Sequence, residues 1–224
     1  MSQAIEICRG FTDDQWRKLR PRLEQNGRIL DDEGAWSCAV DVFERRIRER
    51  FLSSIEALMD ADSRSPRVEI PPEAPPGSTL PKDDGKQIVV PGFAIMALCC
   101  LLIDTLQSFR EARAGASTPN VFKKFLELPA FHAEFDEETA KQFVRGIRDR
   151  ILHDAETREW IILREEPRDR IVERRGKRYA LNRTEFYGAL RTEFENYVQE
   201  LREPSNRERR QRFLSKMDDI AKKC

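Results

Sequence analysis

The segment FAIMALCCLLIDTLQSFREAR, residues 93–113, holds the longest apolar run of this chain and decides its fold. Its first half is apolar on most faces of a helix, which is typical of a helix buried at the centre of a bundle. The run itself, residues 94–103, stops at Asp104 and is too short to cross a bilayer. We therefore expect an all-α protein that is built around this helix and has no membrane segment.

The composition limits which partners the protein can bind and in which cellular compartment we expect it. Lys+Arg and Asp+Glu both number 40, so the formal net charge is zero and a binding site for RNA must come from local clustering of cations. The five cysteines include no CxxC pair, which argues against a disulfide framework or a zinc site. The first residues lack the pattern of a signal peptide. We expect a cytoplasmic protein that needs neither a metal nor another cofactor.

Residues 1–60 are predicted to form an N-terminal helical extension. A short helix is expected over residues 12–26, where Thr12 and Gln15 have the spacing of a capping box. A long amphipathic helix follows over residues 32–59, with apolar side chains at steps of three and four and a solvated arginine run between them. Its apolar stripe must be covered, so we expect it to pack on the rest of the chain or on a partner chain.

Seven prolines and few apolar side chains in residues 61–91 predict an extended proline-rich linker. The bundle proper is then expected over residues 92–203, followed by a charged C-terminal helix over residues 204–224. Besides the apolar segment, periodicity predicts helices over residues 119–128, 137–152 and 184–201. Strand-like runs at residues 160–163, 171–172 and 179–181 predict a small β-hairpin before the last core helix.

The sequence Arg148-Asp149-Arg150-Ile151-Leu152-His153 stands at the end of the predicted helix 137–152 and holds one of only two histidines. An arginine matches a phosphate with a planar fork of donors, and a histidine exchanges protons near neutral pH. Asp149 and His153 are four residues apart and share a face, so the carboxylate can fix the tautomer of the ring. Arg148 and His153 lie about 140° apart around the axis, while Arg145 shares the face of Arg148. A phosphate near this helix end could meet two arginines and a histidine.

This spacing of an arginine, a polar residue and a histidine resembles the motif of HEPN domains, many of which are small helical ribonucleases. The resemblance covers about residues 92–201, and the stretch 152–162 also looks like a bacterial subgroup with a hairpin before its last core helix. It implies an HEPN-like bundle that cleaves RNA without a metal, by attack of the 2′-hydroxyl on the adjacent phosphate. His153 would be the general acid or base, Arg148 would stabilise the transition state, and Asp149 would orient its neighbours. HEPN nucleases usually pair two such sites in a homodimer.

The hairpin region could extend this site. Between Arg145 and Arg183 there are twelve Lys or Arg and eight acids, which leaves a modest local excess of positive charge. We expect Arg145, Arg150 and Trp160 to contact substrate, with Trp160 and Tyr179 as rings on which bases could stack. The alternative is an ordinary charged hairpin facing solvent.

Other interpretations stay open at this point. His153 could simply bond the last carbonyls of its helix, and Arg148 could form a surface ion pair. Asp104 could be a buried partner of Arg148 or an exposed polar edge. The leading function is an endoribonuclease of bacterial defence or of a toxin held by an antitoxin or regulatory protein. The alternatives are a non-catalytic HEPN module that binds RNA or a protein, and an interaction protein that docks through the helix 32–59.

Overall fold

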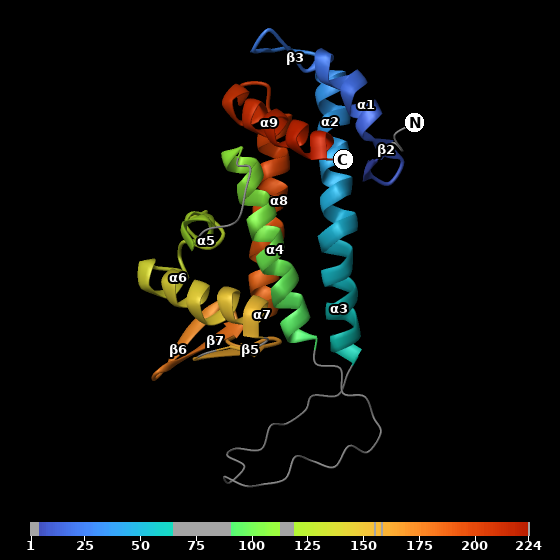
Figure 1. Ribbon diagram of the computed structural model, residues 1–224. Helices are drawn as coiled ribbons and strands as arrows, with labels where there is room; N and C mark the ends of the chain where they lie inside the picture. Colours follow the sequence, from blue (N-terminus) through green and yellow to red (C-terminus); the bar gives the residue numbers. More distant parts are fainter. Residues whose placement is uncertain (1–4, 65–90, 113–118, 155, 158, 224) are drawn as a thin grey trace.

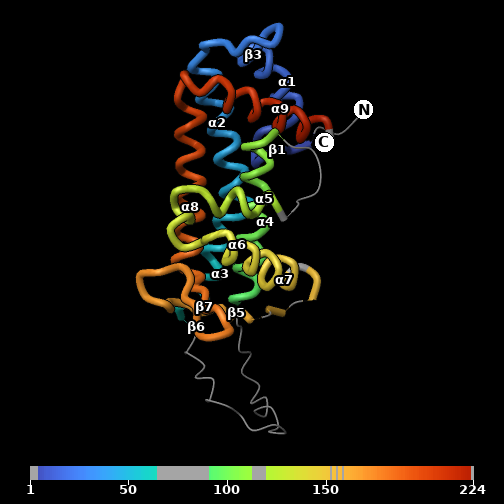
Figure 2. The backbone as a smooth tube through the Cα atoms, turned by 90° about the vertical axis from the view of Figure 1, so that its left-hand side faces the viewer, coloured from blue at the N-terminus to red at the C-terminus, as the bar shows by residue number. Residues whose placement is uncertain are grey.

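The computed structural model describes residues 5–64, 91–112, 119–154, 156–157 and 159–223, and these are mostly helical, as the sequence predicts. Three long helical rods run side by side along the molecule (Figures 1 and 2). The first rod is continuous from α2 to α3 through a π-helical turn, and the other two are α4 and α8. Their bounds are α2 Glu33–Ile47, η2 Arg48–Leu52, α3 Ser53–Arg64, α4 Gly92–Glu111 and α8 Arg183–Arg202.

Helix α4 is the central core helix that its apolar sequence predicts. By length and composition it could cross a membrane, but 56% of its most apolar window is buried inside the molecule. Only Phe93 and Leu101, 39% and 43% exposed, are large apolar side chains of α4 that face outward. This placement is that of a core helix.

The N-terminal rod and the C-terminal helix α9 (Arg207–Lys223) complete one continuous core. The ring of Phe43 on α2 lies 4.7 Å from Phe109 of α4, 5.7 Å from Tyr197 of α8 and 5.6 Å from Phe213 of α9, measured between centroids. The apolar stripe of the helix predicted at 32–59 therefore packs on the bundle, one of the two arrangements expected. Helix α9 crosses the top of the rods beside α1 (Asp13–Leu19) (Figure 1).

The region predicted as one helix over residues 12–26 is divided in the structure. The capping box is present, because Thr12 and Gln15 exchange hydrogen bonds between side chains and backbone. Helix α1 ends before Pro21, which supplies no N–H donor, and a 3₁₀ turn follows. Asn26 and Gly27 have positive φ and form the two-residue turn of a hairpin, which the sequence reading missed. The added elements are β1 Glu6–Cys8, β2 Phe11–Thr12, η1 Arg20–Arg22, β3 Glu24–Gln25 and β4 Arg28–Ile29.

The predicted hairpin before the last core helix is present, and a third strand extends it to a sheet. Strands β6 (Val172–Arg175) and β7 (Arg178–Asn182) pair antiparallel, while β5 (Trp160–Leu163) adds to β7 in parallel, in the order β5-β7-β6. Strand periodicity shows that a segment is a strand but not the direction of its pairing. Here the pairing places Trp160 opposite Tyr179, where the two rings stack.

A buried ion cluster joins the lower end of the N-terminal rod to this sheet and to α8. Asp62 accepts from Arg183 and pairs with Arg164 Nε at 2.6 Å. The Asp62 and Arg183 side chains are 8% and 6% exposed, whereas that of Arg164 is 23% exposed. Helix α3 thus continues to Arg64, so the predicted linker 61–91 starts too early, and its residues 65–90 lie outside the described residues.

Beside the lower half of the rods, a further helix lies across the bundle and above the sheet (Figure 1). It spans residues 137–154 without interruption, and we call it the motif helix. Asp136 caps its start, and Phe143 and Ile147 are buried on its inner side. The short helix α5 (Pro119–Leu126) packs beside it. The parts of the motif helix are α6 Glu137–Phe143, the π-helical turn η3 Val144–Arg148 and α7 Asp149–Asp154.

Candidate functional site

The motif helix brings four of the six predicted site residues to one pocket. In its π-helical turn the Asp149 N–H donates to the carbonyl of Val144, five residues earlier, and such turns are frequent at functional sites. Arg145, Asp149 and His153 follow at intervals of four residues, which places them along one face. Together with Arg150 and Asp154 they line an open pocket of about 390 Å³.

His153 is exposed at the edge of this pocket and has no hydrogen bond or ion pair with any described residue. The sequence predicted that Asp149 would accept a hydrogen bond from the His153 ring and so fix its tautomer. In the structure, Asp149 Oδ1 instead accepts from Arg148 Nη1 at 2.7 Å. Both ring nitrogens of His153 are therefore accessible to a ligand, and the carboxylate is held by the neighbouring arginine.

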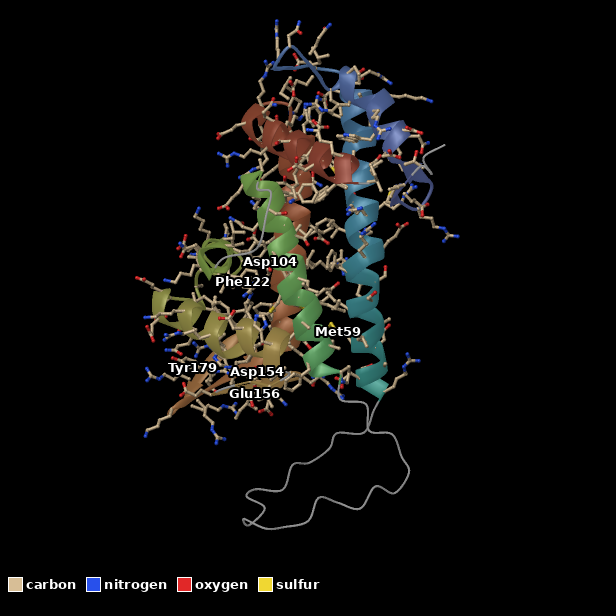
Figure 3. The ribbon with its side chains drawn as sticks, in the orientation of Figure 1. Met59, Asp104, Phe122, Asp154, Glu156 and Tyr179 are labelled. Atoms are coloured by element: carbon tan, nitrogen blue, oxygen red, sulfur yellow. The ribbon has the colours of Figure 1, made fainter. Side chains whose placement is uncertain are left out.

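Arg148 is turned away from the pocket, so the expected convergence of Arg148 and His153 is wrong in this structure. Its side chain is 16% exposed and lies 5.5 Å from the centre of the Phe122 ring, with a longer ion pair of 3.9 Å to Asp104. Figure 3 shows Asp104 and Phe122 next to each other above the motif helix. Their positions confirm that Asp104 faces Arg148, one of the two roles considered for it. The physical cause is packing, because Asp104 on α4 and Phe122 on α5 hold the Arg148 side chain toward the core.

Arg145 is the pocket cation most accessible to a ligand. It is exposed and forms no ion pair with a described residue. Arg150, also expected to contact substrate, pairs with Asp154 and lies 3.9 Å from Glu156, so its charge is largely balanced within the chain. Of the two arginines expected to contact substrate, Arg145 is therefore accessible to a ligand, whereas Arg150 is paired within the chain.

Trp160 does not fit the stacking role expected for it, because the ring is 4% exposed. Its Nε1 donates to the carbonyl of Gln142 at 3.2 Å, and its ring stacks on Tyr179 at 4.7 Å and meets the edge of Phe143. Trp160 is a core residue that fastens the motif helix to the sheet. A tryptophan in a short apolar strand gives no sequence signal that separates these two roles.

Within the described ranges, no three His, Cys, Asp or Glu side chains are grouped so as to hold a metal ion. Burial raises the pKa of the Cys99 and Cys100 thiols, which leaves them protonated in the core. The other histidine, His132, lies 3.0 Å from the carbonyl of Pro129 through its Nδ1.

A second pocket, of about 400 Å³, lies between the β1–β2 hairpin and α2 and was missed from the sequence. Its lining includes Phe11, Cys38 and Arg45. Arg45 donates to the carbonyl of Arg9 at 3.2 Å, and Asp41 on the same rim pairs with Arg202. Its charged groups are thus partnered, and the pocket depends on a hairpin that no sequence signal predicted.

No protein family, no curated protein and no solved structure matches this chain. The HEPN resemblance therefore stays a prediction from the sequence.

Proposed function

We propose that this chain is a metal-independent endoribonuclease of the HEPN type, with the pocket of the motif helix as its catalytic site. The observation that carries the proposal is the row of Arg145, Asp149 and His153 along one face, lining one pocket. His153 and Arg145 are exposed there and are not engaged by other described residues. A proton carrier and a cation next to each other are what phosphodiester transfer requires.

In the proposed reaction the 2′-oxygen of a ribose attacks the adjacent phosphorus while the bond from phosphorus to the 5′-oxygen breaks. The 2′-hydroxyl proton leaves to a base and the departing 5′-oxygen receives a proton, which gives a 2′,3′-cyclic phosphate and a 5′-hydroxyl. His153 performs one of these proton transfers, and Arg145 binds the phosphate oxygens as charge builds up. Arg148 is a positioning residue, because it holds Asp149 beside the pocket.

One chain offers a single histidine at this pocket, whereas the reaction needs both a base and an acid. A two-fold homodimer would place a second His153 and Arg145 at the same cleft, because an isologous contact brings identical residues together. The open side of the pocket leaves room for such a partner. RNA is then the substrate, and an antitoxin or other regulatory protein would hold a nuclease of bacterial defence in check.

The test is cleavage of a fluorescent RNA in the presence of EDTA by the parent, by His153→Ala and by His132→Ala. The two histidines form a matched pair, since both are exposed and only His153 lines the pocket. We expect cleavage with cyclic-phosphate ends by the parent and by His132→Ala, and none by His153→Ala. Cleavage that survives in His153→Ala, or that disappears with EDTA, would rule out this mechanism.

A second candidate is a non-catalytic module of the same kind that binds RNA or a protein partner. The observation that favours it is the inward position of Arg148, whose charge is balanced by Asp149 and Asp104. An arginine held in this way offers nothing to a phosphate. A parent protein that binds RNA and leaves it intact would select this candidate.

A further inference from the structure

The turn between β6 and β7 concentrates positive charge on a short exposed segment. Its sequence is Arg174-Arg175-Gly176-Lys177-Arg178, and all four cations are exposed. The only acid between residues 171 and 182 is Glu173. Gly176 has φ +63°, a conformation that favours glycine and allows the chain to reverse sharply between the arginines. We call residues 174–178 the basic turn.

The basic turn carries more positive charge than its own structure neutralises. Arg175 and Arg178 are directly opposite each other in the register of β6 and β7, and like charges in this arrangement are destabilising. Arg175 is compensated by Glu173 at 2.5 Å and by Glu166 at 3.7 Å. Lys177 and Arg178 have no anionic partner among the described residues. This local conflict points to an anion supplied from outside the chain.

The basic turn is fixed relative to the catalytic pocket by the sheet. Arg178 precedes Tyr179, whose N–H donates to the Glu159 carbonyl at 2.7 Å and whose ring stacks on Trp160. Trp160 in turn donates to the carbonyl of Gln142 on the motif helix. From residue 142 the helix reaches His153 in eleven residues, or about 16 Å at 1.5 Å per residue. Figure 1 shows the sheet directly beneath this helix.

We propose that the basic turn binds the phosphates of the RNA strand whose scissile bond lies at His153. This inference rests on the proposed function and names a second contact of the same substrate. Arg145 lines the pocket and lies on the motif helix between Gln142, which Trp160 contacts, and His153. Cations that follow a strand in this way supply affinity without reading its sequence. The turn therefore serves binding, and the pocket serves chemistry.

The experiment measures binding of a labelled single-stranded RNA by fluorescence anisotropy over a range of salt concentrations. All proteins carry His153→Ala, so that the RNA stays intact. In the double variant Lys177→Gln/Arg178→Gln, the slope of log K against log salt should fall in magnitude by about 1.4, at about 0.7 for each lost phosphate contact. The matched control is Lys18→Gln/Arg28→Gln, which removes an exposed lysine and an exposed arginine at the opposite end of the molecule. Its slope should equal that of the His153→Ala protein.

Each outcome separates the two proposals. Equal slopes for the turn variant and the control would overturn the role of the basic turn while leaving RNA cleavage by the parent untouched. If polyglutamate binds as tightly as RNA, the partner of the basic turn is an acidic protein, and the proposed RNA contact is also overturned. If the salt slope depends on the basic turn but the parent never cuts RNA, the proposed RNA binding by the turn is supported and the proposed nuclease activity is overturned.

Discussion

Replacement of Asp62 by asparagine should lower the free energy of unfolding by about 3 kcal/mol. Asp62 is the anionic partner of Arg183, whose side chain is only 6% exposed. Removal of one member of a buried ion pair costs about 3–5 kcal/mol, because the other charge stays buried without compensation. We expect the lower end of this range, since the asparagine carbonyl still accepts one hydrogen bond from Arg183. Arg164 adds little, because its side chain is more exposed and water solvates it.

Urea unfolding followed by circular dichroism measures this loss, with Asp60→Asn as the control. Asp60 lies on the same helix two residues earlier and is exposed, so its replacement should leave stability nearly unchanged. In a thermal scan the Asp62→Asn midpoint should fall by about 6–12 °C, at 2–4 °C per kcal/mol for a chain of this size. The double variant Asp62→Leu/Arg183→Met should recover most of the loss, because neither charge remains buried. A loss below about 1 kcal/mol for Asp62→Asn would refute the reasoning.

Three further predictions concern the core, its response to pH and the assembly. Phe43→Ala should lower the free energy of unfolding measured in urea by about 3–5 kcal/mol, because four rings surround Phe43. Phe11→Ala should lower it less, because Phe11 is only partly buried. Burial raises the pKa of the Tyr197 phenol, so the folded chain keeps a proton that the unfolded chain loses near pH 10. Stability should therefore decline as the pH rises above about 10, and Tyr197→Phe should weaken that decline in unfolding curves at pH 9 and 11. Sedimentation should show a dimer at micromolar concentration, and a monomer at every concentration would contradict the shared cleft.

The helices were predictable because each depends on a local signal. The apolar periodicity of residues 32–59 and 184–201 is strong over several turns, and it marks the faces that are buried in the structure. Asparagine is a favoured N-cap residue, and the Asn182 side chain accepts from the N–H groups of Thr184 and Glu185 at the start of α8. Capping and periodicity are properties of neighbouring residues, so a sequence is sufficient to read them.

The arrangement of the candidate site depends on tertiary contacts that local sequence patterns do not predict. Which way Arg148 turns is decided by Asp104 and Phe122, which lie on two other helices. Whether Trp160 is exposed depends on the parallel pairing of β5, which buries the ring against Tyr179. The motif therefore locates the helix of the candidate pocket, while which of its arginines is exposed depends on tertiary packing.

The contact of Phe213 with Phe43 has a consequence for how the chain is made on the ribosome. Phe213 also touches Trp16, Trp36 and Phe109, so the last helix closes a cluster of rings that begins near the N-terminus. At roughly 5–20 residues per second, about 10–30 s of synthesis separate Phe43 from Phe213. During that interval the side of the ring cluster that Phe213 covers stays exposed on the nascent chain. Translation that stops before residue 213 would release a polypeptide whose aromatic centre stays open.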